Sequence, residues 1–169
     1  YIKFLLKWND PKAKELLKIV GQENSPNNAK LYFLAWTTTP WTLPGNTALA
    51  VAPEADYSVI QVGSEGNPDR LIIASALVAS VIKEPHQLIA TVKGDLLIGI
   101  SYEKLYDPVS YNVEISSYRR SEELNKEVTT LQPIEDFNPT IIGADFVSLE
   151  DGTGIVHIAP AFGDEDLSA

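Results

Sequence analysis

Short apolar segments separated by turn-forming residues run through most of this chain and restrict its fold class. They recur about every 8–12 residues, a spacing typical of all-β domains. Helix signals stand at two places: Asp10 and Pro11 precede a helix expected over residues 12–20 and closed by Gly21, and Ser75 precedes one expected over 76–83. The pattern predicts a mainly β fold, with a β-barrel-like core and short helices on its outside.

The expected strands follow from the same segments. We expect them over residues 1–6, 30–36, 47–52, 57–62, 70–74, 88–92 and 96–100, and a hairpin between 147–149 and 154–158. Residues 102–138 contain two prolines and a charged stretch, and a third proline follows at 139, so we expect surface loops there with one short strand at 127–131. No repeat and no domain boundary is visible, which predicts a single domain over residues 1–169.

Composition excludes several classes of protein. A chain of 169 residues, 44% of them hydrophobic, is long enough to bury one sizeable core. It has no Cys and only two His, which excludes disulfides and argues against a structural metal site, so we expect no metal and no cofactor. No apolar stretch approaches the ~20 residues that span a bilayer, and no signal peptide is visible, so a cytoplasmic protein without membrane contact is expected. The absence of Met and the start at Tyr1 predict a piece excised from a longer polypeptide.

A threonine-rich run from Trp36 to Asn46 holds an unusual density of hydroxyl groups. It reads Trp-Thr-Thr-Thr-Pro-Trp-Thr-Leu-Pro-Gly-Asn. The β propensity of threonine would explain such a cluster in an arbitrary chain. Pro40 and Pro44, however, fix φ and remove backbone donors, so the run cannot continue a regular strand. The sequence therefore predicts a shaped loop whose hydroxyls can donate to an ester carbonyl as it becomes an oxyanion.

A second segment, residues 152–166, combines a turn, a histidine and an acidic cluster. A Gly-Thr-Gly turn leads into an apolar stretch with His157, and after Pro160 follow Asp164, Glu165 and Asp166. A histidine in an apolar strand is most often a satisfied core imidazole, and clustered acids are most often solvated. Taken alone, neither feature defines a site.

Together the two segments resemble the editing domain inserted in isoleucyl-tRNA synthetases. That family has a similar threonine-rich peptide and, later, a Gly-x-Gly-x-Val-His-x-Ala-Pro block ending in an aspartate. Residues 1–4 resemble the strand by which the family's chain enters the domain. Related valyl and leucyl enzymes carry Thr-Thr-Arg-Pro in the first motif, whereas here Thr39 precedes Pro40, which favours the isoleucyl family.

The resemblance implies roles for individual residues. It implies that the catalytic residues are Thr38, Thr39 and Asp166, and that the substrate-binding residues are Trp36, Thr37, Asn46, His157 and Phe162. In the family the histidine narrows the amino-acid pocket, the aspartate pairs with the substrate's α-ammonium group, and the backbone at the phenylalanine helps to hold the substrate. No protein residue is assigned as general base.

The function implied is hydrolysis of valyl-tRNA(Ile), and of valyl-adenylate as a further ligand. The implied partners are the aminoacylated 3′ end of tRNA(Ile) and the rest of the synthetase chain. A noncatalytic insert that binds tRNA or a partner protein, or the editing domain of a valyl or leucyl enzyme, stays open as an alternative.

The charge of the chain conflicts with nucleic-acid binding. The formal net charge of −10 is unusual for a protein that holds phosphates. The resemblance implies that other parts of the synthetase hold the tRNA body. Arg119, Arg120 and Lys126 are the candidate local basic groups, with a solvated face as the alternative.

Overall fold

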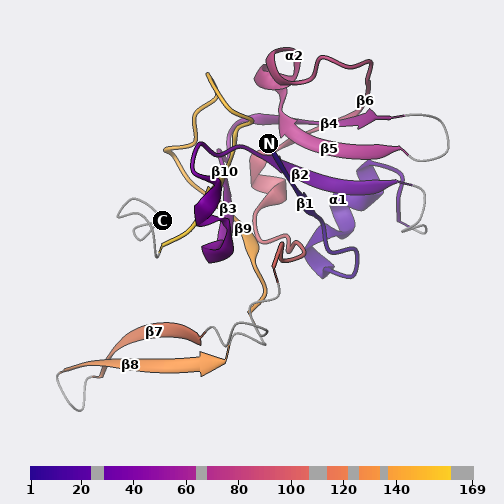
Figure 1. Cartoon of the computed structure of the whole chain (residues 1–169). Helices are drawn as coiled ribbons and strands as arrows, with labels where there is room; N and C mark the ends of the chain where they lie inside the picture. The colour runs from indigo at the N-terminus through magenta and orange to yellow at the C-terminus, as the bar shows by residue number, and fades with distance from the viewer. Residues whose placement is uncertain (24–28, 64–67, 107–113, 122–125, 134–136, 161–169) are drawn as a thin grey trace.

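The computed structural model describes residues 1–23, 29–63, 68–106, 114–121, 126–133 and 137–160, and within 114–121 and 126–133 it describes the backbone. The larger of its sheets has five strands in the order β1-β2-β5-β4-β6 (Figure 1). Their bounds are Ile2–Leu5 for β1, Lys30–Ala35 for β2, Asp69–Ala74 for β5, Asp56–Val62 for β4 and Gln87–Lys93 for β6. The β2–β5 pair is parallel and the other pairs are antiparallel.

A smaller sheet of three strands lies beside it and has the order β10-β3-β9. Its strands are Ile155–Ile158 for β10, Ala48–Val51 for β3 and Thr140–Gly143 for β9. β10 runs antiparallel to β3, and β9 runs parallel to it. Alternate residues of β3 and β10 face different apolar clusters: Leu49, Val51 and Ile155 belong to the main core, while Ala48, Ala50 and Ile158 belong to a smaller one.

Short helices lie outside the sheets, as the sequence predicts. The first is a 3-10 turn η1 (Pro11–Ala13) that continues into α1 (Lys14–Ile19), and the second is η3 (Ser75–Leu77) continuing into α2 (Val78–Val81). Leu16 and Leu17 of α1 are buried in the main core. Gly21 closes α1 with a φ of 67°, which a glycine adopts without strain.

Asp10 is the N-cap of the first helix. Its carboxylate accepts a hydrogen bond from the Lys12 backbone N–H at 2.8 Å and another from the Ser101 backbone N–H. Partial burial by itself raises the pKa of this carboxyl, but the hydrogen bonds from Ser101 and Lys12 outweigh that effect and hold the pKa below its ordinary value. The cap therefore connects η1 to the loop that follows β6.

A two-stranded ribbon forms a separate sheet. β7 (Glu114–Ser121) pairs with β8 (Lys126–Pro133) in antiparallel register, from Glu114 opposite Pro133 to Ser121 opposite Lys126. Figure 1 shows the ribbon standing away from the two other sheets. The sequence predicted only the central part of β8, because prolines and charges dominate this region.

The prediction of a mainly β fold with short outer helices is confirmed, and the described strands form separate sheets, not a closed barrel. The predicted strand at 96–100 is wrong, because the chain forms a 3-10 turn η4 (Gly94–Leu97) instead. A Cβ at Gly94 would lie 2.1 Å from the Ala52 backbone oxygen, so the chain passes too close to its neighbour for any side chain here.

Two other local predictions are also wrong. The hairpin between 147–149 and 154–158 does not form, because β10 pairs with β3 and not with the segment before its turn. Ser75 does not cap α2 through its side chain; its hydroxyl lies 2.8 Å from the Ser58 hydroxyl. In the described part of the chain, no helix is long and apolar enough to cross a membrane.

We predict that Gly154→Ala destabilises the fold more than Gly21→Ala. Both glycines have φ near +70°, where a Cβ costs about 1–2 kcal/mol. At Gly154 the new Cβ would also lie 2.4 Å from Ala74 Cβ, whereas at Gly21 nothing lies within 4 Å. Urea unfolding should show a loss of about 1–3 kcal/mol for Gly154→Ala beyond that of Gly21→Ala. Equal losses would show that the close contact with Ala74 is relieved at no cost.

Candidate functional site

The threonine-rich run begins where β2 ends and is attached at once to β10. Trp36 forms a parallel bridge with Val156, and its backbone N–H donates to the Ile155 carbonyl at 3.4 Å. The first and second motifs of the sequence are therefore neighbours, although more than a hundred residues separate them in the chain. This contact brings the hydroxyl-bearing loop and His157 to the same edge of the small sheet.

The loop then turns through a 3-10 helix, η2 (Pro40–Gly45). Pro40 occupies its first turn, where a missing N–H costs nothing. The Thr42 N–H donates to the Thr39 carbonyl at 3.1 Å, and the Asn46 N–H donates to the Leu43 carbonyl at 3.0 Å. The expectation of a shaped loop in place of a strand is thereby confirmed.

The three threonines before η2 lie at the surface. Thr38 and Thr39 are exposed, and Thr37 is half-buried. Thr37 Oγ1 accepts from the Thr39 backbone N–H at 3.0 Å and lies 3.3 Å from Thr39 Oγ1. This local turn orders the backbone while Thr38 and Thr39 remain accessible to a ligand.

His157 lies in β10 opposite Leu49 of β3 and is buried, with 7% of its surface exposed. Its Nε2 is 2.7 Å from Thr42 Oγ1, and that hydroxyl donates to the Thr39 carbonyl at 2.8 Å. The imidazole is thus tied through Thr42 to the turn that carries the exposed threonines. The Nε2 side of the ring therefore helps to hold the loop in place.

Asn46, at the end of η2, contacts the other side of the imidazole. Its Nδ2 lies 3.4 Å from His157 Nδ1 and donates to the Ala48 carbonyl at 2.8 Å. The Tyr102 hydroxyl donates to Asn46 Oδ1 at 2.6 Å. Burial raises the pKa of Tyr102 far above its ordinary value, so this phenol stays protonated and remains a donor.

Trp36 packs over the turn that precedes β10. A Cβ at Gly152 would lie 2.7 Å from the Trp36 ring, so only glycine allows the indole to sit this close. Trp41, by contrast, is 69% exposed. Of the residues predicted for the site, Trp36, Thr37, Thr38, Thr39, Asn46 and His157 are brought together at this edge. Phe162 and Asp166, with Asp164 and Glu165, lie outside the described residues.

Comparison with known proteins places this arrangement in a family. The chain is 40% identical over 149 residues to the isoleucine–tRNA ligase of Clostridium tetani, a match that covers 88% of the chain and 11% of the ligase. It is 38% identical over 161 residues to the ligase of Pyrococcus horikoshii, a match that covers 94% of the chain and 13% of the ligase. It is 34% identical over 145 residues to the ligase of Dehalococcoides mccartyi, covering 86% of the chain and 13% of the ligase. The chain is homologous to one segment of the isoleucine–tRNA ligases. It spans about an eighth of the length of these relatives.

Solved structures show the same fold in editing domains. The crystal structure of GlLeuRS-CP1 has a TM-score of 0.67 at 20% identity, covering 99% of this chain and 56% of that one. The Plasmodium falciparum cytosolic leucyl-tRNA synthetase editing domain has a TM-score of 0.59 at 12% identity, covering 98% and 54%. No family model matches the chain. The homology to isoleucine–tRNA ligases and the editing-domain fold agree with the resemblance seen in the sequence.

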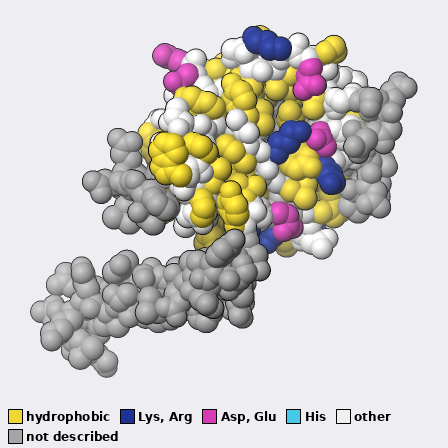
Figure 2. Space-filling model, viewed as in Figure 1, with side chains coloured by type: hydrophobic (Ala, Val, Ile, Leu, Met, Phe, Trp, Pro, Cys, Tyr) yellow, Lys and Arg dark blue, Asp and Glu magenta, His cyan; other side chains and the backbone are white. Residues whose placement is uncertain are grey.

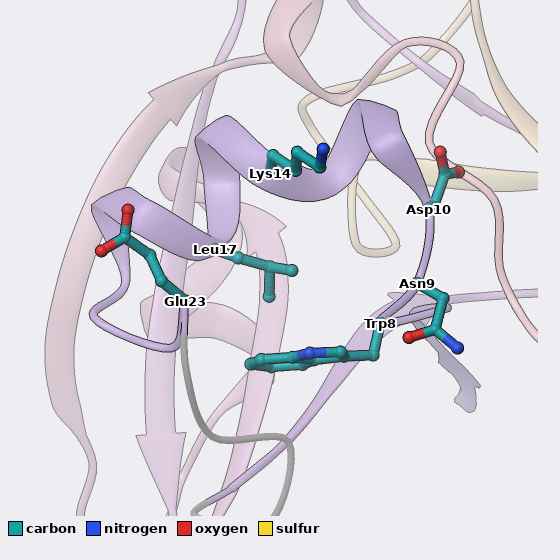
Figure 3. A pocket seen from close by; sticks show the side chains of 6 residues that line it. All are labelled: Trp8, Asn9, Asp10, Lys14, Leu17 and Glu23. Carbon is teal, nitrogen blue, oxygen red and sulfur yellow. The ribbon is translucent and has the colours of Figure 1, made fainter.

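A large hollow lies elsewhere, beside helix α1, with a volume of about 420 Å³. Figure 3 shows the Trp8 ring below Leu17, with Asp10 and Glu23 at opposite ends of the helix. It shares no residue with the site of the homologous motifs. A much smaller hollow of about 30 Å³ adjoins Asn46 and is lined also by Leu43, Pro44, Tyr106 and Phe137 among others. Position relative to the chemistry, and not size, therefore identifies the site.

The described residues offer no metal site, and the basic groups on one face of the molecule are dispersed. No group of three or more His, Asp or Glu in the described ranges could hold a metal ion. On the face shown in Figure 2, the Lys and Arg side chains are scattered among acidic ones. His86, the second histidine, is exposed and lies 3.0 Å from the Glu84 carbonyl, away from both motifs.

Two residues of the site escaped the sequence analysis. Thr42 belongs to the threonine-rich run, but nothing in the run separates it from the three threonines before it; only the 3-10 turn directs it to His157. Tyr102 stands 56 residues after Asn46, in a region without a motif. No signal in a single sequence could have paired them.

We predict that Thr42→Val loosens His157 more than Thr47→Val does. Both changes replace a hydroxyl by a methyl group of the same shape, and the Thr47 hydroxyl makes only a long 3.3 Å bond to the Ile158 carbonyl. Losing the 2.7 Å contact to His157 should cost about 1–3 kcal/mol in urea unfolding and should broaden or shift the His157 imidazole signals in NMR. Unchanged His157 signals in folded Thr42→Val would show that Thr42 does not hold the ring.

Proposed function

We propose that this chain is a hydrolytic editing domain that deacylates valyl-tRNA(Ile) and also accepts valyl-adenylate. The observation that carries the proposal is the juxtaposition of exposed Thr38 and Thr39 with buried His157, made by the contacts of Thr42 and Asn46. Homology to one segment of the isoleucine–tRNA ligases and the editing-domain fold support it. A soluble cytoplasmic synthetase and the aminoacylated 3′ end of tRNA(Ile) are its proposed setting and partner.

The need for such a site follows from the limits of hydrophobic selection. A pocket built for isoleucine cannot strongly exclude valine, and this pair of amino acids is the standard example of the limit, since one methylene is worth about 1–3 kcal/mol. A second site that admits valine but not isoleucine removes the error by hydrolysis. The domain needs to recognise only the amino acid and the ester.

The reaction adds one water to one ester. Water attacks the ester carbonyl carbon, the tetrahedral oxyanion collapses, and the C–O bond to the ribose breaks, giving valine and the free ribose hydroxyl. One proton of the water ends on that hydroxyl. Donors in the loop, the Thr38 and Thr39 hydroxyls and nearby backbone N–H groups, stabilise the developing oxyanion.

His157 acts in this proposal by its shape. Both ring nitrogens already contact protein groups, Thr42 on one side and Asn46 on the other, and the ring is buried. A general base needs a nitrogen directed at the attacking water. We therefore propose that the His157 ring excludes isoleucine's extra methylene. The attacking water is positioned by the site and by the terminal ribose hydroxyl of the substrate.

Asp166 is proposed to bind the α-ammonium group of the substrate. This role rests on the family resemblance, since the residue lies outside the described ranges. We predict that Asp166→Ala lowers the deacylation rate of valyl-tRNA(Ile) about ten- to a hundredfold, because a hydrogen bond to a charged group contributes about 1.5–3 kcal/mol. Single-turnover deacylation measures this.

Asp164→Ala is the matched control, since it removes the same charge from the same cluster and should leave the rate unchanged. If folded Asp166→Ala deacylates at the wild-type rate, the ammonium role is lost. If the wild-type chain, in excess over substrate, does not deacylate valyl-tRNA(Ile), the chain is a noncatalytic insert.

We predict that His157→Ala admits isoleucine. The ratio of isoleucyl-tRNA to valyl-tRNA deacylation should rise by about tenfold or more, because the space that the ring occupies becomes available to the extra methylene. His86→Ala, at an exposed histidine away from both motifs, should leave the ratio unchanged. A folded His157→Ala with the wild-type ratio would refute the steric role.

A further inference from the structure

The orientation of the Asn46 side chain is fixed at both of its polar atoms. Its Oδ1 accepts from the Tyr102 hydroxyl at 2.6 Å, and its Nδ2 donates to the Ala48 carbonyl at 2.8 Å. A backbone carbonyl can only accept, so the atom facing Ala48 must be the nitrogen. The amide therefore cannot exchange its oxygen and nitrogen without losing both bonds.

This orientation decides which nitrogen of His157 carries the proton. Asn46 Nδ2, 3.4 Å away, presents an N–H to His157 Nδ1, so Nδ1 must accept. The proton of the neutral ring then lies on Nε2 and donates to Thr42 Oγ1 at 2.7 Å. The Thr42 hydroxyl in turn donates its own proton to the Thr39 carbonyl at 2.8 Å.

The hydrogen bonds thus run in one direction, from the Tyr102 phenol through Asn46, His157 and Thr42 to the Thr39 carbonyl. We propose that Tyr102 is a positioning residue of the editing site: its hydroxyl fixes the Asn46 amide, and through it the tautomer and ring orientation of His157. The effect on editing rests on the proposed function, whereas the tautomer is a property of the chain alone. Tyr102 touches no reacting atom.

Tyr102 is well placed to hold the network rigidly. Its side chain is fully buried, and its ring packs edge-on against Phe4, with centroids 5.2 Å apart and planes at 76°. Its backbone N–H donates to the Pro139 carbonyl at 3.2 Å, and it forms a bridge with Leu6. The phenol oxygen is therefore held by the main core while its proton is directed at the site.

The test is Tyr102→Phe, which removes one oxygen and keeps the ring. Without the phenol donor, the Asn46 amide is held only by its bond to the Ala48 carbonyl and turns more readily. A turned amide presents Oδ1 to His157, which favours the proton on Nδ1. ¹⁵N NMR of histidine-labelled chain distinguishes the two tautomers, and only two histidines give signals. We expect the Nε2-protonated form in the wild type and a shift toward Nδ1 protonation in Tyr102→Phe.

Tyr57→Phe is the matched control. Tyr57 is also fully buried, its hydroxyl donates to the Gly154 carbonyl at 2.6 Å, and burial raises its pKa to about 12. It should lower stability without changing the tautomer. Asn46→Asp, whose carboxylate can only accept, should draw the proton to Nδ1 even with Tyr102 present.

The editing readout is the ratio of isoleucyl-tRNA to valyl-tRNA deacylation. It should rise several-fold in Tyr102→Phe and stay constant in Tyr57→Phe, because a loosened ring excludes the methylene less well. A wild-type His157 protonated on Nδ1, or a folded Tyr102→Phe with unchanged tautomer and ratio, overturns the proposal. A wild type that does not deacylate either substrate refutes the proposed function, and the tautomer measurement still decides the role of Tyr102.

Discussion

The site depends on how β10 is held between strand β3 and the residue that follows strand β2. On one side it pairs with β3 in antiparallel register, with His157 opposite Leu49 and the Thr47 N–H on the Ile158 carbonyl. On the other side Trp36, just past β2, bridges to Val156. Because side chains alternate along a strand, a slip of one residue would turn His157 away from Thr42 and bring a valine or isoleucine in its place. The four-residue strand β10 therefore joins the two sheets and the two motifs. Its register determines whether His157 can contact Thr42 and Asn46.

The polar groups of the site are of two kinds: buried groups that hold the loop, and exposed groups on the loop. Thr42, His157 and Tyr102 are buried and hydrogen-bonded to one another or through Asn46, whereas Thr38 and Thr39 lie exposed on the turn that this network holds. Buried polar groups stabilise a structure only when their partners are in place, so the network favours a single arrangement of the loop. Donors that are already oriented need no reorganisation when an oxyanion forms, which is the main physical advantage that a protein site has over water. The buried network therefore fixes the turn that carries the exposed donors and, in the proposed function, the His157 ring that excludes the extra methylene.

The sequence predicted those features that depend on neighbours in the chain and missed those that depend on distant contacts. Asp10, Pro11 and Gly21 predicted the first helix correctly, because caps and turns are local. Pro40 and Pro44 likewise predicted that the threonine run leaves the strand. The predicted strand at 96–100 is replaced by a 3-10 turn in which Gly94 packs against the Ala52 backbone, a contact between segments far apart in the chain. The predicted hairpin at 147–158 does not form because β10 pairs with β3. For the site, the resemblance located the two motifs, but only the fold shows that Thr42 and Tyr102 connect them.

The negative net charge of the chain is consistent with the proposed editing function. With 23 acidic and 13 basic side chains, the domain carries a net negative charge, which disfavours binding that depends mainly on contacts with phosphates. A site that recognises an ester by hydroxyls, an amino acid by shape and an ammonium group by a carboxylate needs no phosphate contact. Hydrolysis removes the one cationic group at the end of the substrate, and with it the attraction to the acidic site. The product end, now carrying only phosphates and hydroxyls, is repelled by the same charges. The negative balance that argues against tight nucleic-acid binding would thus favour release of the edited tRNA.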